Sequence, residues 1–88
     1  MSELEKNFIV NAVDAFRSVN EISCIKYVSE RSKQNVYKIN GEECFSEELK
    51  LSLKSFVINS KLLHNILLDY QLENLLFNQL RHYLRLES

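Results

Sequence analysis

Residues 61–86, KLLHNILLDYQLENLLFNQLRHYLRL, decide the fold of this 88-residue chain. The segment holds ten leucines and no Gly or Pro. It therefore predicts one continuous helix, about 39 Å long at a rise of 1.5 Å per residue. Ser60 stands where an N-cap is expected, and Arg81, His82 and Arg85 lie in the last turns, where cations suit the helix dipole.

The apolar residues of this helix cover about 240° of its circumference, far more than the stripe of roughly 100° on an ordinary surface helix. One face is expected to form the core, with Leu63, Ile66, Tyr70, Phe77, Leu80 and Leu84. A second face is expected to meet a partner, with Leu68, Leu72, Leu75, Tyr83 and Leu86. The alternative is a central helix whose two faces are both covered by the rest of a single chain.

Upstream of this helix, β-branched and aromatic residues between 21 and 45 favour strands. Asn40-Gly41 contains the only glycine. Asn-Gly is the preferred pair for a two-residue type I′ turn, because both positions need a positive φ. We expect three strands, near 22–29, 35–39 and 42–45. The alternative is a helix over 21–33, with Asn40-Gly41 as a helix C-cap.

Two further segments show helical spacing. Residues 3–19 follow a candidate cap at Ser2. Their apolar face is expected to hold Leu4, Phe8, Ala12, Ala15, Phe16 and Val19. Residues 47–58 begin with acids after Ser46, which indicates a helix start. Alternate leucines at 49, 51 and 53 also fit a strand, so that alternative stays open.

In order, these elements predict an α+β fold that is predominantly helical. It has an N-terminal helix, a small antiparallel β-hairpin or meander around Asn40-Gly41, a short helix or strand at 47–58, and a long Leu-rich C-terminal helix. Residues 1–88 are expected to form a single domain, because the chain is too short for two domains of ordinary size.

Composition excludes several classes of function. A hydrophobic content of 45% excludes intrinsic disorder, and a net charge of -1 gives no electrostatic sign of nucleic-acid binding. One glycine is too few for a glycine-rich phosphate loop. His64 and His82 would lie about 27 Å apart on one helix, too far to share a metal ion. We therefore expect no enzyme activity, no cofactor and no metal.

The cysteines and the N-terminus bear on the compartment. Cys24 and Cys44 form no CxxC pair and are expected to be reduced thiols in a reducing compartment. Residues 1–10 lack the apolar run of a secretory signal. These observations favour a cytoplasmic protein with no membrane span.

The excess of leucine points to a non-enzymatic protein–protein interaction module. We expect a small adaptor, inhibitor or chaperone-like regulatory subunit that dimerises or docks through its C-terminal helix. Its partner is expected to be a second copy, a different protein, or both. The alternative is a nucleic-acid-binding regulator that uses the basic segment 26–38. Its candidate contacts are Lys26, Arg31, Lys33, Lys38 and Lys61.

If residues 46–58 form a strand, the order α-β-β-β-α is similar to that of the double-stranded RNA-binding domain. Ser60-Lys61 then resembles the phosphate-contacting start of that family's last helix, which implies RNA binding. This chain lacks the family's glycine-rich approach to that helix, and the family's run of lysines is reduced to Lys61. The sequence therefore assigns no family.

Overall fold

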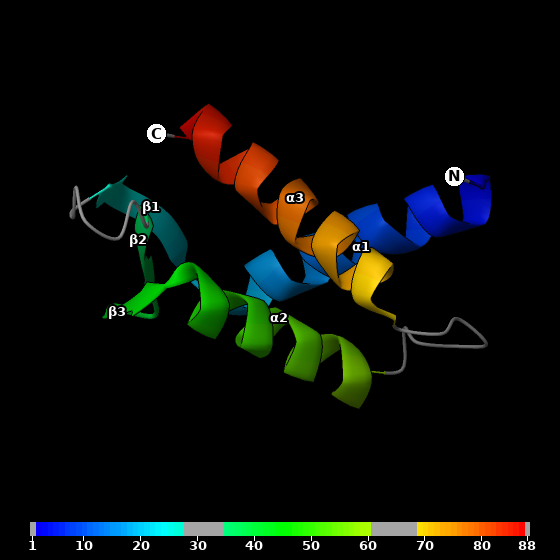
Figure 1. The fold of residues 1–88 in the computed structure, drawn as a ribbon, viewed down its shortest axis with the longest axis horizontal. Coiled ribbons are helices and arrows are strands. Elements are labelled where there is room, and N and C mark those ends of the chain that lie inside the picture. Colours follow the sequence, from blue (N-terminus) through cyan, green and yellow to red (C-terminus); the bar gives the residue numbers. More distant parts are fainter. Residues whose placement is uncertain (1, 28–34, 61–68, 88) are drawn as a thin grey trace.

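The computed structural model describes residues 2–27, 35–60 and 69–87, without the side chains of 26–27 and 86–87 (Figure 1). The elements in order are α1 (Glu3–Val19), β1 (Ile22–Tyr27), β2 (Asn35–Ile39), β3 (Glu42–Phe45), α2 (Ser46–Asn59) and α3 (Tyr70–Glu87). This order confirms the predicted α+β class. The chain measures 40 × 24 × 22 Å, with the small sheet at one end and the N-terminus of α1 at the other.

The sheet is antiparallel with the order β1-β2-β3. Asn40 and Gly41 have φ values of 53° and 87°, so both adopt the positive φ that a type I′ turn requires. The hairpin is therefore confirmed, and the helical alternative is wrong over residues 22–27. The pairing of β1 with β2 shifts between Cys24 and Lys26, which places a β-bulge in this edge strand.

Asn40 also ties the hairpin turn to the end of α1. Its side-chain oxygen accepts a hydrogen bond from the Glu21 backbone N–H at 2.9 Å. Its side-chain NH₂ donates to the Asn20 side-chain oxygen at 2.8 Å. The Asn40 backbone N–H donates to the Glu21 carbonyl at 2.8 Å, and Asn20 in turn donates to the Phe16 carbonyl at 3.0 Å. The turn thus fixes where the chain leaves α1 and enters β1.

Residues 46–59 form a helix, as the acids after Ser46 predict. Leu49, Leu53 and Val57 are buried, whereas Leu51, which produced the strand-like alternation, is 65% exposed. Ser60 closes this helix, because its N–H and hydroxyl both donate to the Val57 carbonyl. The residues that Ser60 was expected to cap, from 61 onward, lie outside the described part of the chain.

The C-terminal helix begins at Tyr70, not near residue 61. The Asp69 carboxylate accepts a hydrogen bond from the Leu72 N–H at 2.9 Å, which is the bond that an N-cap makes. The helix is therefore about 27 Å long rather than 39 Å. Leu63 and Ile66, which were predicted for the core, lie outside the described residues.

Helix α3 crosses α1 and contacts α1, α2 and β1 (Figure 1). Phe77, Leu80 and Leu84 are buried as predicted. Tyr70 is 77% exposed, so its predicted core position is wrong. As the first residue of α3, it lies at the helix end, away from the core cluster. The chain itself buries Leu72 and Leu76 as well, whereas Leu75 and Tyr83 on the same helix are half-buried.

The other helices complete one cluster of buried side chains. From α1 it takes Phe8, Ile9, Ala12, Val13 and Phe16. Leu4 and Val19 were predicted for this face but are 69% and 65% exposed, because they lie at the two ends of α1. Glu73, at the edge of the apolar arc of α3, is neutralised by Lys54 of α2, with 2.7 Å between Nζ and Oε1.

Candidate functional site

The structure separates the five residues that the sequence offered as an interface. Leu72 is only 5% exposed and belongs to the core cluster, so it supports the fold of the single chain. Leu75 and Tyr83 are half-buried and pack against the edge of that cluster. Leu68 and the side chain of Leu86 lie outside the described part of the chain. Leu75 and Tyr83 are thus the described members that reach the surface.

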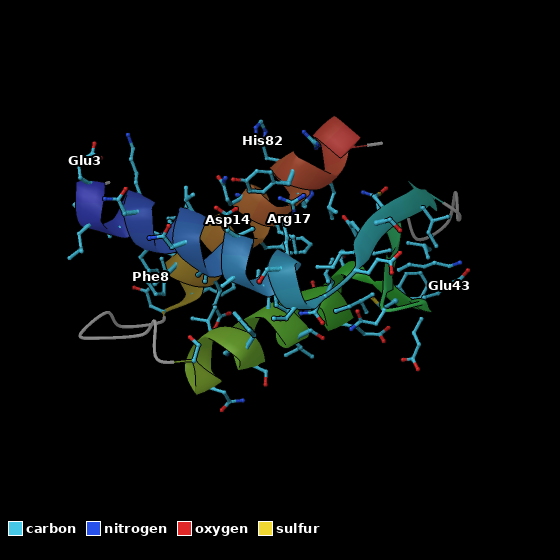
Figure 2. The ribbon with its side chains drawn as sticks, turned by 180° about the vertical axis from the view of Figure 1, so that it is seen from behind. Glu3, Phe8, Asp14, Arg17, Glu43 and His82 are labelled. Atoms are coloured by element: carbon cyan, nitrogen blue, oxygen red, sulfur yellow. The ribbon has the colours of Figure 1, made fainter. Side chains whose placement is uncertain are left out.

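Leu75 lines an open groove of about 530 Å³ between α1 and α3. Helix α1 contributes Lys6, Ile9 and Val10, and α3 contributes Leu75, Asn78, Gln79 and His82. Ile9 is 5% exposed and forms the floor, while Val10 is 37% exposed. His82 projects outward from α3 in Figure 2, where α1 lies in front. The groove therefore has an apolar centre with polar side chains around it.

The sequence did not single out the α1 side of this groove. Ile9 and Val10 fall outside the apolar face predicted for residues 3–19, which was drawn through Phe8 and Ala12. The adjacent apolar pair is a signal in the sequence, because two successive residues point about 100° apart on a helix. Such a pair widens an apolar face beyond what one neighbouring helix covers.

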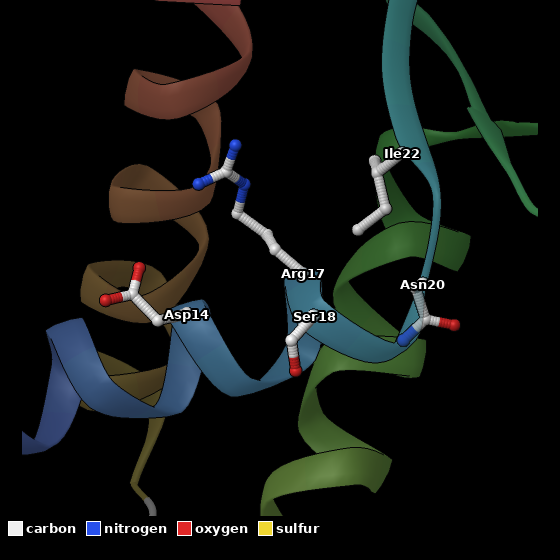
Figure 3. Close-up of a pocket in the computed structure, with 5 residues that line it drawn as sticks. All are labelled: Asp14, Arg17, Ser18, Asn20 and Ile22. Atoms are coloured by element: carbon white, nitrogen blue, oxygen red, sulfur yellow. The ribbon is translucent and has the colours of Figure 1, made fainter.

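Part of the half-buried Tyr83 side chain is covered by another residue of the same chain. The Arg17 guanidinium carbon lies 4.2 Å from the centre of the Tyr83 ring, in a cation–π contact. Figure 3 shows Arg17 reaching from α1 toward α3, on the border of a pocket of about 460 Å³. One face of the predicted interface tyrosine is thus occupied by α1 of its own chain.

The pocket beside Arg17 is lined mostly by polar side chains, and two of them donate hydrogen bonds to backbone carbonyls of α1. It is lined by Asp14, Arg17, Ser18, Asn20 and Ile22 (Figure 3). The Ser18 hydroxyl donates to the Ala15 carbonyl at 2.7 Å, and the Asn20 amide donates to the Phe16 carbonyl. These lining residues include no nucleophile paired with a base. The geometry of this pocket therefore supports a structural role.

The basic residues of the nucleic-acid alternative are placed only in part. Lys38 is exposed on the outer face of β2, opposite Ser23 of β1 and Glu43 of β3. Opposite charges on neighbouring strands attract each other, so Glu43 reduces the positive potential at Lys38. Arg31, Lys33, Lys61 and the side chain of Lys26 lie outside the described residues.

The two cysteines are free and flank Tyr37 across the sheet, since Cys24 and Cys44 both pair with it. Two strand spacings put their Cα atoms about 10 Å apart. A disulfide needs Cα atoms less than about 7 Å apart, so this sheet keeps the two thiols separate. Burial, and then the charge of Glu48, raise the pKa of the Cys44 thiol.

We expect iodoacetamide to modify Cys24 faster than Cys44 in the folded protein. Cys44 is only 9% exposed, and its raised pKa lowers the fraction of reactive thiolate. Mass spectrometry of the digested protein after timed alkylation measures both rates, with the urea-unfolded chain as the control in which the difference disappears. Equal rates in the folded protein would contradict the buried position of Cys44.

The raised pKa of the Cys44 thiol also makes the free energy of unfolding decrease as the pH rises into the alkaline range. Because the pKa of Cys44 is higher in the folded state than in the unfolded state, the folded state binds more protons between the two values. Its contribution to stability is complete below the unfolded-state pKa. It is lost as the pH rises through the folded-state pKa, at alkaline pH.

Within residues 2–27, 35–60 and 69–87, no three His, Cys, Asp or Glu side chains gather as metal ligands. Among the helices of these ranges, none is long and apolar enough to cross a membrane. His64 lies outside the described residues.

Neither a protein-family model, nor a curated protein, nor a solved structure matches the chain. The candidate site therefore rests on the groove between α1 and α3.

Proposed function

We propose that this protein is a non-enzymatic protein–protein interaction module that docks through the groove between α1 and α3. The observation that supports this proposal is the apolar part of the groove, formed by the exposed Val10 and the half-buried Leu75 beside the buried Ile9. Lys6, Asn78 and His82 border it. An apolar centre inside a polar rim is the arrangement that protein interfaces have.

The groove revises which part of the C-terminal helix would bind a partner. Leu72 and Leu76 are buried against the rest of the chain, so they stabilise the docking surface from behind. Leu75 remains at the surface because it lies on the side of α3 that faces the groove. A partner would therefore contact α1 and α3 together, instead of a complete second face of α3.

The first partner that we propose is a second copy of this chain. A two-fold dimer would bring the same groove together from both copies, and such dimers are the commonest oligomers. The second is a different protein that presents an apolar helix or loop, with this chain as a small adaptor, inhibitor or chaperone-like subunit. We propose that the protein acts in the cytoplasm, a reducing compartment in which free cysteines persist. Of the candidate contacts for nucleic acid, Lys38 is the one whose side chain is described, and Glu43 lies opposite it on β3.

Size-exclusion chromatography with light scattering tests the dimer over a range of concentrations. We expect the wild-type mass to rise from 10.4 kDa toward twice that value. Leu75→Asp should keep the helical circular dichroism of the wild type but remain monomeric, because it places a charge at the centre of the groove. Uncompensated burial of a carboxylate at an interface costs several kcal/mol, so we expect dissociation to increase at least about a hundredfold.

Leu51→Asp is the matched control. Leu51 is 65% exposed on α2 and lies outside the groove, so the same change there should leave assembly intact. A wild-type mass of 10.4 kDa at every concentration would exclude the homodimer. Proteins captured from the native host would then be compared between the two variants. Loss of a partner with Leu51→Asp but not with Leu75→Asp would place docking on α2.

A further inference from the structure

A third pocket, of about 470 Å³, lies between β2, α2 and α3. Two cationic side chains enter it, Lys50 from α2 and Arg81 from α3. Lys50 Nζ lies 5.3 Å from the centre of the Phe77 ring, and the Arg81 guanidinium carbon lies 5.9 Å from the same centre. Both cations therefore line one pocket around the same ring, which gives the pocket a local positive potential.

The described acids do little to neutralise these two charges. Lys50 is 3.9 Å from a Glu47 side chain that is 79% exposed, and an ion pair of that length and exposure is weak. Among the described residues, no carboxylate forms an ion pair with Arg81. Lys54, one turn further along α2, differs because Glu73 contacts it at 2.7 Å. The excess positive charge therefore belongs to this pocket and not to α2 as a whole.

Three amide side chains add neutral hydrogen-bond donors to the pocket. Asn35 comes from β2, and Asn74 and Asn78 lie one turn apart on α3. None of these side chains forms a hydrogen bond to another described residue. No buried polar side-chain atom in the described part of the chain lacks a partner, so these amides face water. They are available to a ligand.

We propose that this pocket binds a phosphate group. An arginine fork, a lysine ammonium and amide N–H groups are donors that recognise oxyanions, and two cations with little neutralisation match a doubly charged anion. The volume lies within the range of small-molecule sites, so there is room for a phosphate monoester as well as for the free ion. The pocket shares Asn78 with the α1–α3 groove but is otherwise formed by different residues, so this proposal does not depend on docking.

Titration with inorganic phosphate and, separately, with phenyl phosphate tests the site. Sodium chloride is adjusted to hold the ionic strength constant, and ¹H–¹⁵N NMR follows the side-chain NH₂ signals of Asn35, Asn74 and Asn78. We expect saturable shifts at these signals. Tighter binding of phenyl phosphate would identify an organic phosphate as the preferred ligand, whereas equal binding would identify the free ion. Shifts that do not saturate, or that spread evenly over the surface, would overturn the proposal.

Charge-removing variants separate the pocket from a general effect of positive charge. Arg81→Gln and Lys50→Gln should each weaken phosphate binding about tenfold or more, because each removes a charged hydrogen-bond donor. Lys54→Gln removes the same charge from α2 outside the pocket and should leave the affinity unchanged. Equal weakening in Lys54→Gln and Lys50→Gln would overturn the site. Circular dichroism checks each fold, and Lys50→Gln remains decisive if Arg81→Gln does not fold.

Discussion

Leu72→Asp will unfold the isolated chain. Leu72 is 5% exposed in the core cluster, where a carboxylate would be surrounded by apolar side chains. Burial of such an unpaired charge costs several kcal/mol, comparable with the roughly 5–15 kcal/mol that stabilises a whole domain. Circular dichroism at 222 nm during heating and urea titration measures the effect. We expect the helical signal to be lost or its midpoint to fall steeply.

Leu75→Asp is the informative comparison, because it makes the same change one turn away on the same helix. Leu75 is half-buried at the groove, so its aspartate reaches water and the fold should survive. The two variants thus distinguish a core leucine from a surface leucine. The sequence alone does not tell these two leucines apart. A folded, helical Leu72→Asp monomer would show that Leu72 lies at a surface, and the packing of α3 into the core cluster would be wrong.

Asn40→Ala should produce the second large loss of stability, about 2–3 kcal/mol. The substitution removes the hydrogen bonds to the Glu21 N–H and to Asn20, at roughly 1 kcal/mol each. It also leaves an alanine at a φ of 53°, which costs about 1 kcal/mol. Urea denaturation followed by circular dichroism measures the change in the free energy of unfolding.

Asn40→Gly separates the two causes. Glycine accepts a positive φ without strain, so this variant should lose the hydrogen bonds alone and be about 1 kcal/mol more stable than Asn40→Ala. Equal stability of the two variants would show that backbone conformation contributes nothing at this position. Wild-type stability in both would contradict the tie between the hairpin turn and α1.

Local chemistry in the sequence predicted the elements whose signals are local. Asn40-Gly41 specified its turn because few other pairs adopt two successive positive φ angles. The acids after Ser46 marked the start of α2 correctly. Leu51 made the leucine spacing fit a strand as well as a helix, but it is an exposed leucine and does not belong to the buried face. The start of α3 was missed because the leucine period runs through Asp69 without a Gly or Pro to interrupt it.

Tertiary packing decided what spacing could not. A helical wheel shows that α3 is apolar on two sides, but it does not show whether α1 or another molecule covers the second side. The structure buries Leu72 in the core cluster and leaves Leu75 at the groove. The phosphate pocket carries no local signal at all, because Lys50 and Arg81 meet only when α2 and α3 pack together.

The two edges of the described sheet limit how this protein can assemble. β1 is interrupted by a bulge between Cys24 and Lys26, and β3 is four residues long with Glu42 and Glu43 in it. A bulge disrupts the regular ladder that an added strand would need, and charges on a short edge repel a neighbouring copy. Edge-to-edge growth into ribbons or fibrils is therefore discouraged at both ends of the sheet. The dimer proposed above would instead use the helices, where association can stop at a closed pair.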